Sequence, residues 1–198
     1  MSNLDHVVTI VSGLPRSGTS MMMKMMDAAE LPILTDNLRT ADADNPKGYY
    51  EFEPVKKMRE DVSWMPEAVG KVVKIISFLL TTLPPEFQYK VVFVRRAIPE
   101  VLSSQQKMMD RRGETNKVDD GKMTDLYEKH LTQIKKWLAE QKNIDVLYVD
   151  HQDAMANPVA VAKRVNAFLG GHLDEAKMAG VVDNSLYRNR VEDAPSIM

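Results

Sequence analysis

The stretch that most constrains the fold is residues 7–20, VVTIVSGLPRSGTS, where a Val- and Ile-rich run breaks into a glycine-bounded loop before a predicted helix. Gly13 and Gly18 are separated by four residues and followed by two hydroxyl residues, the spacing of a loop that cradles phosphate with backbone N–H groups. The nucleoside-triphosphate form of this loop has a lysine after the second glycine, whereas this chain has Thr19 there and Arg16 inside the loop. We therefore predict an anion site at a helix N-terminus, with a changed ligand.

The composition excludes several classes of protein. The chain has 198 residues, 44% hydrophobic and 27% charged, so we expect one globular domain over residues 1–198. A net charge of −2 argues against a nucleic-acid partner, and the absence of cysteine excludes disulfides and thiolate metal sites. No apolar stretch reaches the roughly 18–20 residues that span a bilayer, and the start lacks a signal-peptide pattern. We therefore expect a cytoplasmic protein without a membrane partner.

Apolar runs alternate with helical patterns along the chain. Strands are predicted at 7–11, 71–76, 89–94 and 145–149, and helices at 19–29, 99–111, 123–141 and 158–169. Continuous Val/Ile strands separated by helices are typical of a parallel sheet covered on both faces. We therefore expect an α/β fold, a three-layer sandwich with a mainly parallel central sheet. Ligands of such sheets lie beyond the carboxyl ends of the strands.

Three other segments have a less definite pattern. The methionine cluster at 21–26 (MMMKMM) favours a buried core face over a substrate-facing surface. The polar segments 32–53 and 111–121 are predicted loops, and each is either a lid over an acceptor site or a plain solvated loop.

Cations follow the predicted strands. Lys74 lies near the end of the second strand, and Arg95 and Arg96 directly follow the third. Together with Arg16 they converge at one edge of the expected sheet, which favours a multiply anionic ligand, because a buried unpaired cation is costly. The alternative is that Arg95 or Arg96 pairs with a nearby acid such as Glu100 or Asp110.

A serine follows Arg96 at a spacing of eight residues. Ser104 would lie about two turns into the helix, where it and Arg96 can hold one phosphate between them. With these residues in place, GLPRSGTS and VVFVRRAIPEVLSSQ resemble the PAPS-dependent sulfotransferases, where PAPS is 3'-phosphoadenosine 5'-phosphosulfate. The resemblance implies a P-loop NTPase-like sulfotransferase fold, PAPS as co-substrate and no metal.

The resemblance also implies which residues bind PAPS. The 5'-phosphosulfate would be held by the loop residues Gly13, Pro15, Arg16, Ser17, Gly18, Thr19 and Ser20. Arg96 and Ser104 match the family's 3'-phosphate pair; Arg95 and Ser103 have the same spacing. The segments NPKGYYE, LYVDHQDAMANP and VNAFLGGHLD are similar to segments of bacterial members, so the resemblance covers most of residues 7–175. The late basic residues Arg188 and Arg190 match a segment that reaches the 3'-phosphate.

The reaction implied is in-line transfer of a sulfuryl group to a hydroxyl or amine, with Arg16 and Lys74 neutralising charge on the leaving phosphate. Lys74 occupies the place of the lysine near the sulfuryl group, but where cytosolic members have a histidine two residues later this chain has Ile76. Other branches use a glutamate, so we expect Glu51 as the general base, with Glu53 second. Either is alternatively a surface carboxylate, or a partner of Lys56 or Lys57.

The four histidines are expected to be structural or exposed: His6, His130, His151 and His172. His151, just past the fourth strand, is the best candidate for an exception.

Two rival functions remain open at this stage. An ATP- or GTP-dependent P-loop kinase or hydrolase is supported by Ser20 as a magnesium ligand and by Asp150 at the end of strand four. A non-catalytic nucleotide-binding module is the other. The sequence identifies no acceptor beyond a small molecule or carbohydrate. It also leaves open an acceptor pocket completed by a second subunit, that is, a homodimer.

Overall fold

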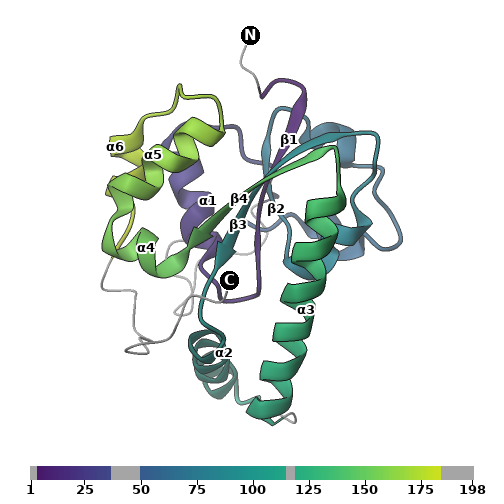
Figure 1. The fold of residues 1–198 in the computed structure, drawn as a ribbon, viewed down its shortest axis with the longest axis vertical. Helices are drawn as coiled ribbons and strands as arrows, with labels where there is room; N and C mark the ends of the chain where they lie inside the picture. The colour runs from purple at the N-terminus through teal and green to yellow at the C-terminus, as the bar shows by residue number, and fades with distance from the viewer. Residues whose placement is uncertain (1–3, 37–49, 115–118, 184–198) are drawn as a thin grey trace.

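The computed structural model describes residues 4–36, 50–114 and 119–183. Within these ranges four strands form one parallel sheet with the order β2-β1-β3-β4 (Figure 1). The strands are β1 (Val7–Gly13), β2 (Val72–Lys74), β3 (Gln88–Arg95) and β4 (Ile144–Asp150). All four predicted strands are confirmed, each within two residues of its expected ends.

The register of the sheet brings the ends of the strands together. Val11 of β1 lies opposite Lys74 of β2, Gly13 lies opposite Val94 of β3, and Arg95 lies opposite Asp150 of β4. Because the strands are parallel, these positions share one edge, the edge at which ligands of such sheets bind.

Helices cover both faces of the sheet, which gives the expected three layers (Figure 1). One face is covered by α1 (Thr19–Ala28), α4 (His151–Ala156), α5 (Pro158–Phe168) and α6 (Glu175–Gly180). The other is covered by α3 (Asp120–Glu140) and three 3-10 helices: η1 (Glu53–Lys57), η2 (Met65–Ala68) and η3 (Ser77–Thr82). Helix α2 (Ile98–Arg112) follows β3 and extends away from the carboxyl edge of the sheet.

The core follows the two-residue period of the strands. Val8 and Ile10 of β1 pack on the α3 face with Ile134, whereas Val11 packs on the α1 face. The α1 face is filled by methionines, and four of them are fully buried: Met22, Met23, Met25 and Met26. The prediction that the methionine cluster forms a core face is therefore confirmed.

Several elements differ from the sequence prediction. The three 3-10 helices, α4 and α6 were not predicted, because helices of one or two turns show no clear periodicity. The expected loop 111–121 is shorter, since α2 continues to Arg112 and α3 already begins at Asp120. The Asp119 side chain accepts hydrogen bonds from the Gly121 and Lys122 N–H groups, an N-cap that starts α3 early.

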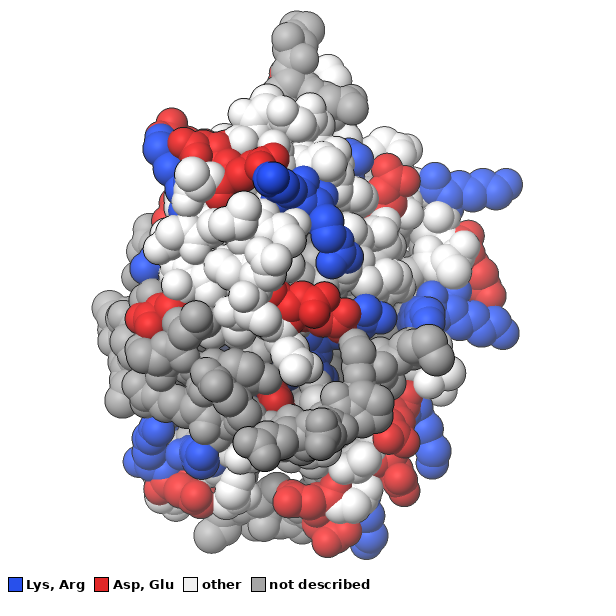
Figure 2. All heavy atoms as spheres, turned by 60° about the vertical axis from the view of Figure 1, so that its left-hand side comes forward, with Lys and Arg blue, Asp and Glu red and all other residues white. Residues whose placement is uncertain are grey.

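The surface carries charges of both signs. Figure 2 shows Lys and Arg side chains intermixed with Asp and Glu side chains over the face turned forward there. Among the helices that the structure describes, none is both long and apolar enough to cross a membrane.

Candidate active site

The loop between β1 and α1 is bounded by two glycines that no other residue could replace without strain. Gly13 has φ 152°, and a Cβ there would lie 2.5 Å from both Ser17 Oγ and the Val94 carbonyl oxygen. Gly18 caps α1 with φ 103°, and a Cβ there would collide with the His151 ring. The loop backbone therefore lies tightly against β3 and α4, at a helix N-terminus where N–H groups attract an anion.

Ser17 provides a second indication of a ligand at this loop. Its side chain is 1% exposed, and its Oγ has no hydrogen-bond partner within the described residues. A buried hydroxyl without a partner costs about 1–3 kcal/mol, and a phosphate oxygen at this position would offset that cost. The glycine cradle and the unpartnered Ser17 hydroxyl therefore fit a phosphate-bearing ligand.

Arg16 joins the loop to the end of β3 and to α2. It has φ 69°, a conformation that residues other than glycine rarely adopt. Its Nε donates to Ser104 Oγ over 3.1 Å, and its carbonyl oxygen accepts from Arg96 Nη1 over 3.1 Å. Ser104 is buried whereas Ser103 is exposed, so the phase of α2 turns Ser104 toward the loop.

Both arginines at the end of β3 pair with acids; the alternative interpretation of the sequence anticipated Glu100 as a partner but not Asp150. Arg96 Nε lies 2.8 Å from Glu100 Oε2, and these side chains are 9% and 5% exposed. Arg95 Nη2 lies 2.7 Å from Asp150 Oδ2 on the neighbouring strand. Buried charges require such partners, and each pair fixes the orientation of its guanidinium group. Asp150, the residue that a metal-dependent kinase would need, is engaged by Arg95.

Lys74 lies on the opposite side of the loop from Arg96, because β2 and β3 flank β1. Its Nζ is 3.1 Å from Oγ of Ser20 in the first turn of α1. Lys74, Arg16 and Arg96 therefore lie along one edge of the sheet, around the N-terminus of α1. The other loop residues from the sequence prediction are part of the same turn: Pro15 is half-buried and Thr19 is buried.

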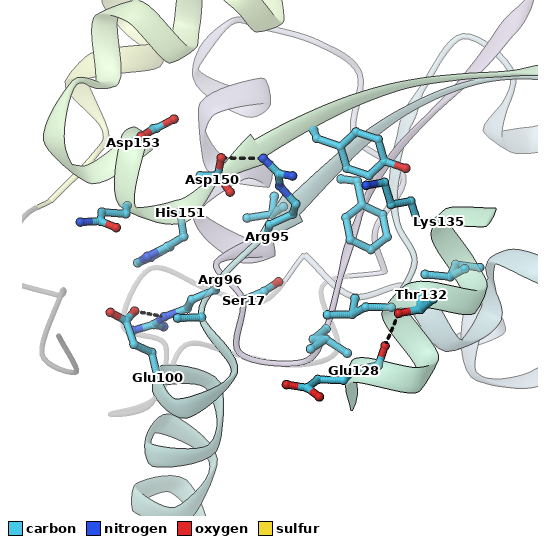
Figure 3. A pocket seen from close by; sticks show the side chains of 18 of the residues that line it. Ser17, Arg95, Arg96, Glu100, Glu128, Thr132, Lys135, Asp150, His151 and Asp153 are labelled. Atoms are coloured by element: carbon cyan, nitrogen blue, oxygen red, sulfur yellow. Dashed lines mark hydrogen bonds and ion pairs between the residues drawn. The ribbon is translucent and has the colours of Figure 1, made fainter. Parts of the chain in front are cut away.

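A cavity of about 290 Å³ opens beside this edge. Leu14 and Ser17 of the loop line it, together with the ends of β3 and β4 and the middle of α3. Figure 3 shows His151 between the Arg95–Asp150 and Arg96–Glu100 pairs, with Thr132 and Lys135 of α3 on the other side. The apolar residues that line the cavity are Phe93, Leu131, Ile134, Leu138 and Tyr148. The cavity thus has charged residues next to the loop and an apolar part formed by β3, β4 and α3.

Comparison with known families shows to which family the chain belongs. A family model described as sulfotransferase domain matches residues 7–193. The chain belongs to the sulfotransferase domain family. It therefore transfers a sulfuryl group to an acceptor, and the family takes that group from PAPS and acts on small-molecule acceptors.

Solved sulfotransferase structures share the fold. The sulfotransferase domain of the Synechococcus PCC 7002 olefin synthase has a TM-score of 0.54 at 14% identity, with 96% of this chain and 90% of that chain covered. The sulfotransferase domain from the curacin biosynthetic pathway has 0.54 at 11%, covering 96% and 93%. Mouse sulfotransferase SULT7A1, complexed with PAP, has 0.52 at 15%, covering 89% and 63%. Comparison with curated protein sequences gave no match.

His151 of the sulfotransferase lines the cavity, although sequence reasoning expected it to be structural or exposed. It directly follows β4, is 6% exposed and packs against Gly18. Burial, and secondarily the charge of Arg96, lower the pKa of His151 to about 3, so the ring is neutral at physiological pH. The signal available in the sequence was its place just after a strand, at the ligand-binding edge.

The expected base residues of the sulfotransferase lie around η1. The carbonyl oxygen of Glu51 accepts a hydrogen bond from Thr35 Oγ1 over 2.8 Å. Glu53 is exposed and pairs with Lys56 Nζ over 2.7 Å, as the alternative interpretation of the sequence anticipated. Arg188 and Arg190, expected near the 3'-phosphate, lie outside the described residues.

The remaining histidines fall into two groups. His6 and His172 are exposed, as expected. His130 of α3 is half-buried, and its Nε2 contacts Oγ of the buried Ser77.

Proposed function

We propose that this sulfotransferase uses PAPS, with the 5'-phosphosulfate in the loop Gly13–Ser20 and the 3'-phosphate at Arg96 and Ser104. The observation that carries the proposal is the hydrogen-bonded cluster of Arg16, Arg96 and Ser104. This cluster joins the loop, which favours a phosphate, to Arg96 and Ser104, which can hold another phosphate. A ligand with phosphates at both ends of a nucleoside matches that arrangement, whereas a linear triphosphate tail needs only the loop.

The residues divide the chemistry between them. The acceptor oxygen would attack the sulfur atom in line, while the bond between sulfur and the bridging phosphate oxygen breaks and its electron pair leaves with 3'-phosphoadenosine 5'-phosphate (PAP). Arg16, Lys74 and the loop N–H groups would neutralise the charge that develops on that bridge. Positioning would supply most of the remaining acceleration.

The ion pairs at the end of β3 support this role for Arg96. Glu100 and the Arg16 carbonyl oxygen hold the guanidinium in one orientation, so little side-chain entropy is lost when a phosphate binds. Arg95 would act indirectly, since it is fixed to Asp150 across the sheet. A kinase would require that aspartate for magnesium.

The experiment is a pair of titrations followed by a transfer assay. PAP without magnesium should raise the melting temperature of the protein, and ATP with magnesium should raise it less, because at equal concentration the ligand with the higher affinity for the folded state stabilises it more. Labelled PAPS should then transfer sulfate to a member of a panel of phenols, alcohols, sugars and amines. Stabilisation by ATP–magnesium alone would refute the proposal, and PAP binding without any transfer would favour the non-catalytic module.

Other expectations from the sequence stay predictions: a single domain over residues 1–198, a cytoplasmic location, a homodimer, the absence of a metal, and ligand roles for Arg188 and Arg190. Glu51 stays a candidate for the proton acceptor.

A further inference from the structure

A histidine outside the proposed donor site has a defined polar contact. His130 lies on α3, and its Nε2 is 2.9 Å from Oγ of Ser77, the buried first residue of η3. The imidazole stacks on Phe78 with a ring distance of 3.8 Å and an interplanar angle of 15°. Two neighbouring residues of one element therefore fix the position and the plane of the ring.

This pair lies close to the sulfuryl-transfer end of the proposed site. Ser77 follows Lys74 by three residues, so only two residues separate the end of β2 from the start of η3. Phe78 packs in the same apolar cluster as Leu14 of the loop. Leu131, the next residue of α3, packs against that cluster and lines the cavity together with Leu14. His130 is thus on the β2 side of the loop, the side of Lys74.

The surroundings of His130 favour the neutral imidazole. Burial lowers the pKa of His130 below its usual value, so the ring carries a lone pair at neutral pH. The groups packed against it are Ser77 and Phe78 of η3 and, through Phe78, Tyr127 of α3. Along the chain, the nearest charged residues are Glu128 and Lys129 before His130 on α3, and Lys74 of β2 before Ser77.

We propose that His130 is the general base that accepts the proton of the acceptor hydroxyl. In this arrangement Nε2–H donates to Ser77 Oγ, and Nδ1 takes the proton. As the acceptor O–H bond breaks, the oxygen forms its bond to sulfur, and the bond from sulfur to the bridging phosphate oxygen breaks with its electron pair leaving on PAP. Ile76, two residues after Lys74, has no ionisable group, and α3 supplies one instead. The inference rests on the proposed function.

The test compares two acceptors that differ in their need for a base. Phenol is protonated near neutral pH, whereas 4-nitrophenol can be assayed at a pH where it is already the phenolate. His130→Gln should lower kcat/KM for phenol about a hundredfold, the usual contribution of a positioned base, and that for 4-nitrophenolate only a few-fold. The exposed His172→Gln is the matched control and should leave both rates unchanged. The rise in phenol rate with pH that reports the wild-type base should be absent in His130→Gln.

Several results would overturn the assignment. Equal losses with both acceptors, or no loss with either, would make His130 structural. A phenol-specific loss in Glu51→Gln, with none in His130→Gln, would assign the base to Glu51. Should wild type use neither phenol, slow release of sulfate from PAPS to water replaces them, and unchanged release in His130→Gln rejects the proposal. The thermal shift by PAP tests the donor site separately, so its absence in wild type would refute the proposed function instead.

Discussion

The Nε of Arg16 donates a hydrogen bond to Oγ of Ser104 over 3.1 Å, which joins a loop residue to a helix residue 88 positions later. Arg96 adds a second link by donating to the Arg16 carbonyl oxygen. The two segments proposed to hold the two ends of the donor are therefore in contact before any ligand binds. A ligand that bridges them needs little rearrangement, which favours tight binding.

The first prediction concerns the 3'-phosphate. Arg96→Ala should weaken PAP binding by at least tenfold and leave adenosine 5'-phosphate nearly unaffected, because only PAP carries the 3'-phosphate. Ser104→Ala removes one hydrogen bond, worth about 1 kcal/mol, and should weaken PAP roughly fivefold. Calorimetric titration of both nucleotides measures the difference, with the exposed Arg112→Ala as control. Equal losses for PAP and adenosine 5'-phosphate would remove Arg96 from this role.

The second prediction separates turnover from binding at Lys74. Lys74→Met should lower kcat about a hundredfold, since it removes a charge proposed to stabilise the transition state. The affinity for PAP, which lacks the sulfuryl group, should change only slightly. Single-turnover rates and PAP titration of the same sample provide the comparison. A parallel loss of PAP affinity and turnover would show that Lys74 stabilises the bound nucleotide and the transition state equally.

The third prediction concerns the glycine that caps α1. Gly18→Ala should destabilise the protein by about 3 kcal/mol or more, because its Cβ strains a left-handed backbone and meets the buried His151 ring. Gly113→Ala is the matched control, since Gly113 has φ 67° with nothing within 4 Å of its Cβ, and should cost only about 1 kcal/mol. Urea unfolding measures both. Replacing His151 by Ala in the Gly18→Ala variant should recover part of the loss; no recovery would locate the strain elsewhere.

The fourth prediction follows from the pKa of His151. In the unfolded chain this ring binds a proton below about pH 6.5, whereas in the folded protein burial lowers its pKa to about 3. Between these values the unfolded state holds more protons than the folded state. The stability that His151 contributes is therefore complete above pH 6.5, and it is lost as the pH falls, by up to about 1.4 kcal/mol per pH unit. His151→Phe should flatten the dependence of unfolding free energy on pH between 6.5 and 4, whereas His172→Gln should retain it. Identical slopes in wild type and His151→Phe would contradict the shift.

The fold could be predicted from the sequence because its signals are local. The Val- and Ile-rich runs of β1 and β3, the spacing of Gly13 and Gly18, and the helical pattern after each strand depend only on residues close along the chain. The same locality explains the misses: α4 and α6 are too short for a periodic pattern.

The sequence by itself determined the parallel α/β architecture, the glycine-bounded loop after β1 and the cationic residues at the ends of β2 and β3. Only the tertiary structure decided which of those cations pair with Glu100 and Asp150, and which residues distant in sequence meet, as Ser104 meets Arg16 and His130 meets Ser77. Periodicity reports how each element buries its own apolar face. The approach of side chains from α2 and α3 to the edge of the sheet depends on how whole elements pack in three dimensions, which no short stretch of sequence encodes.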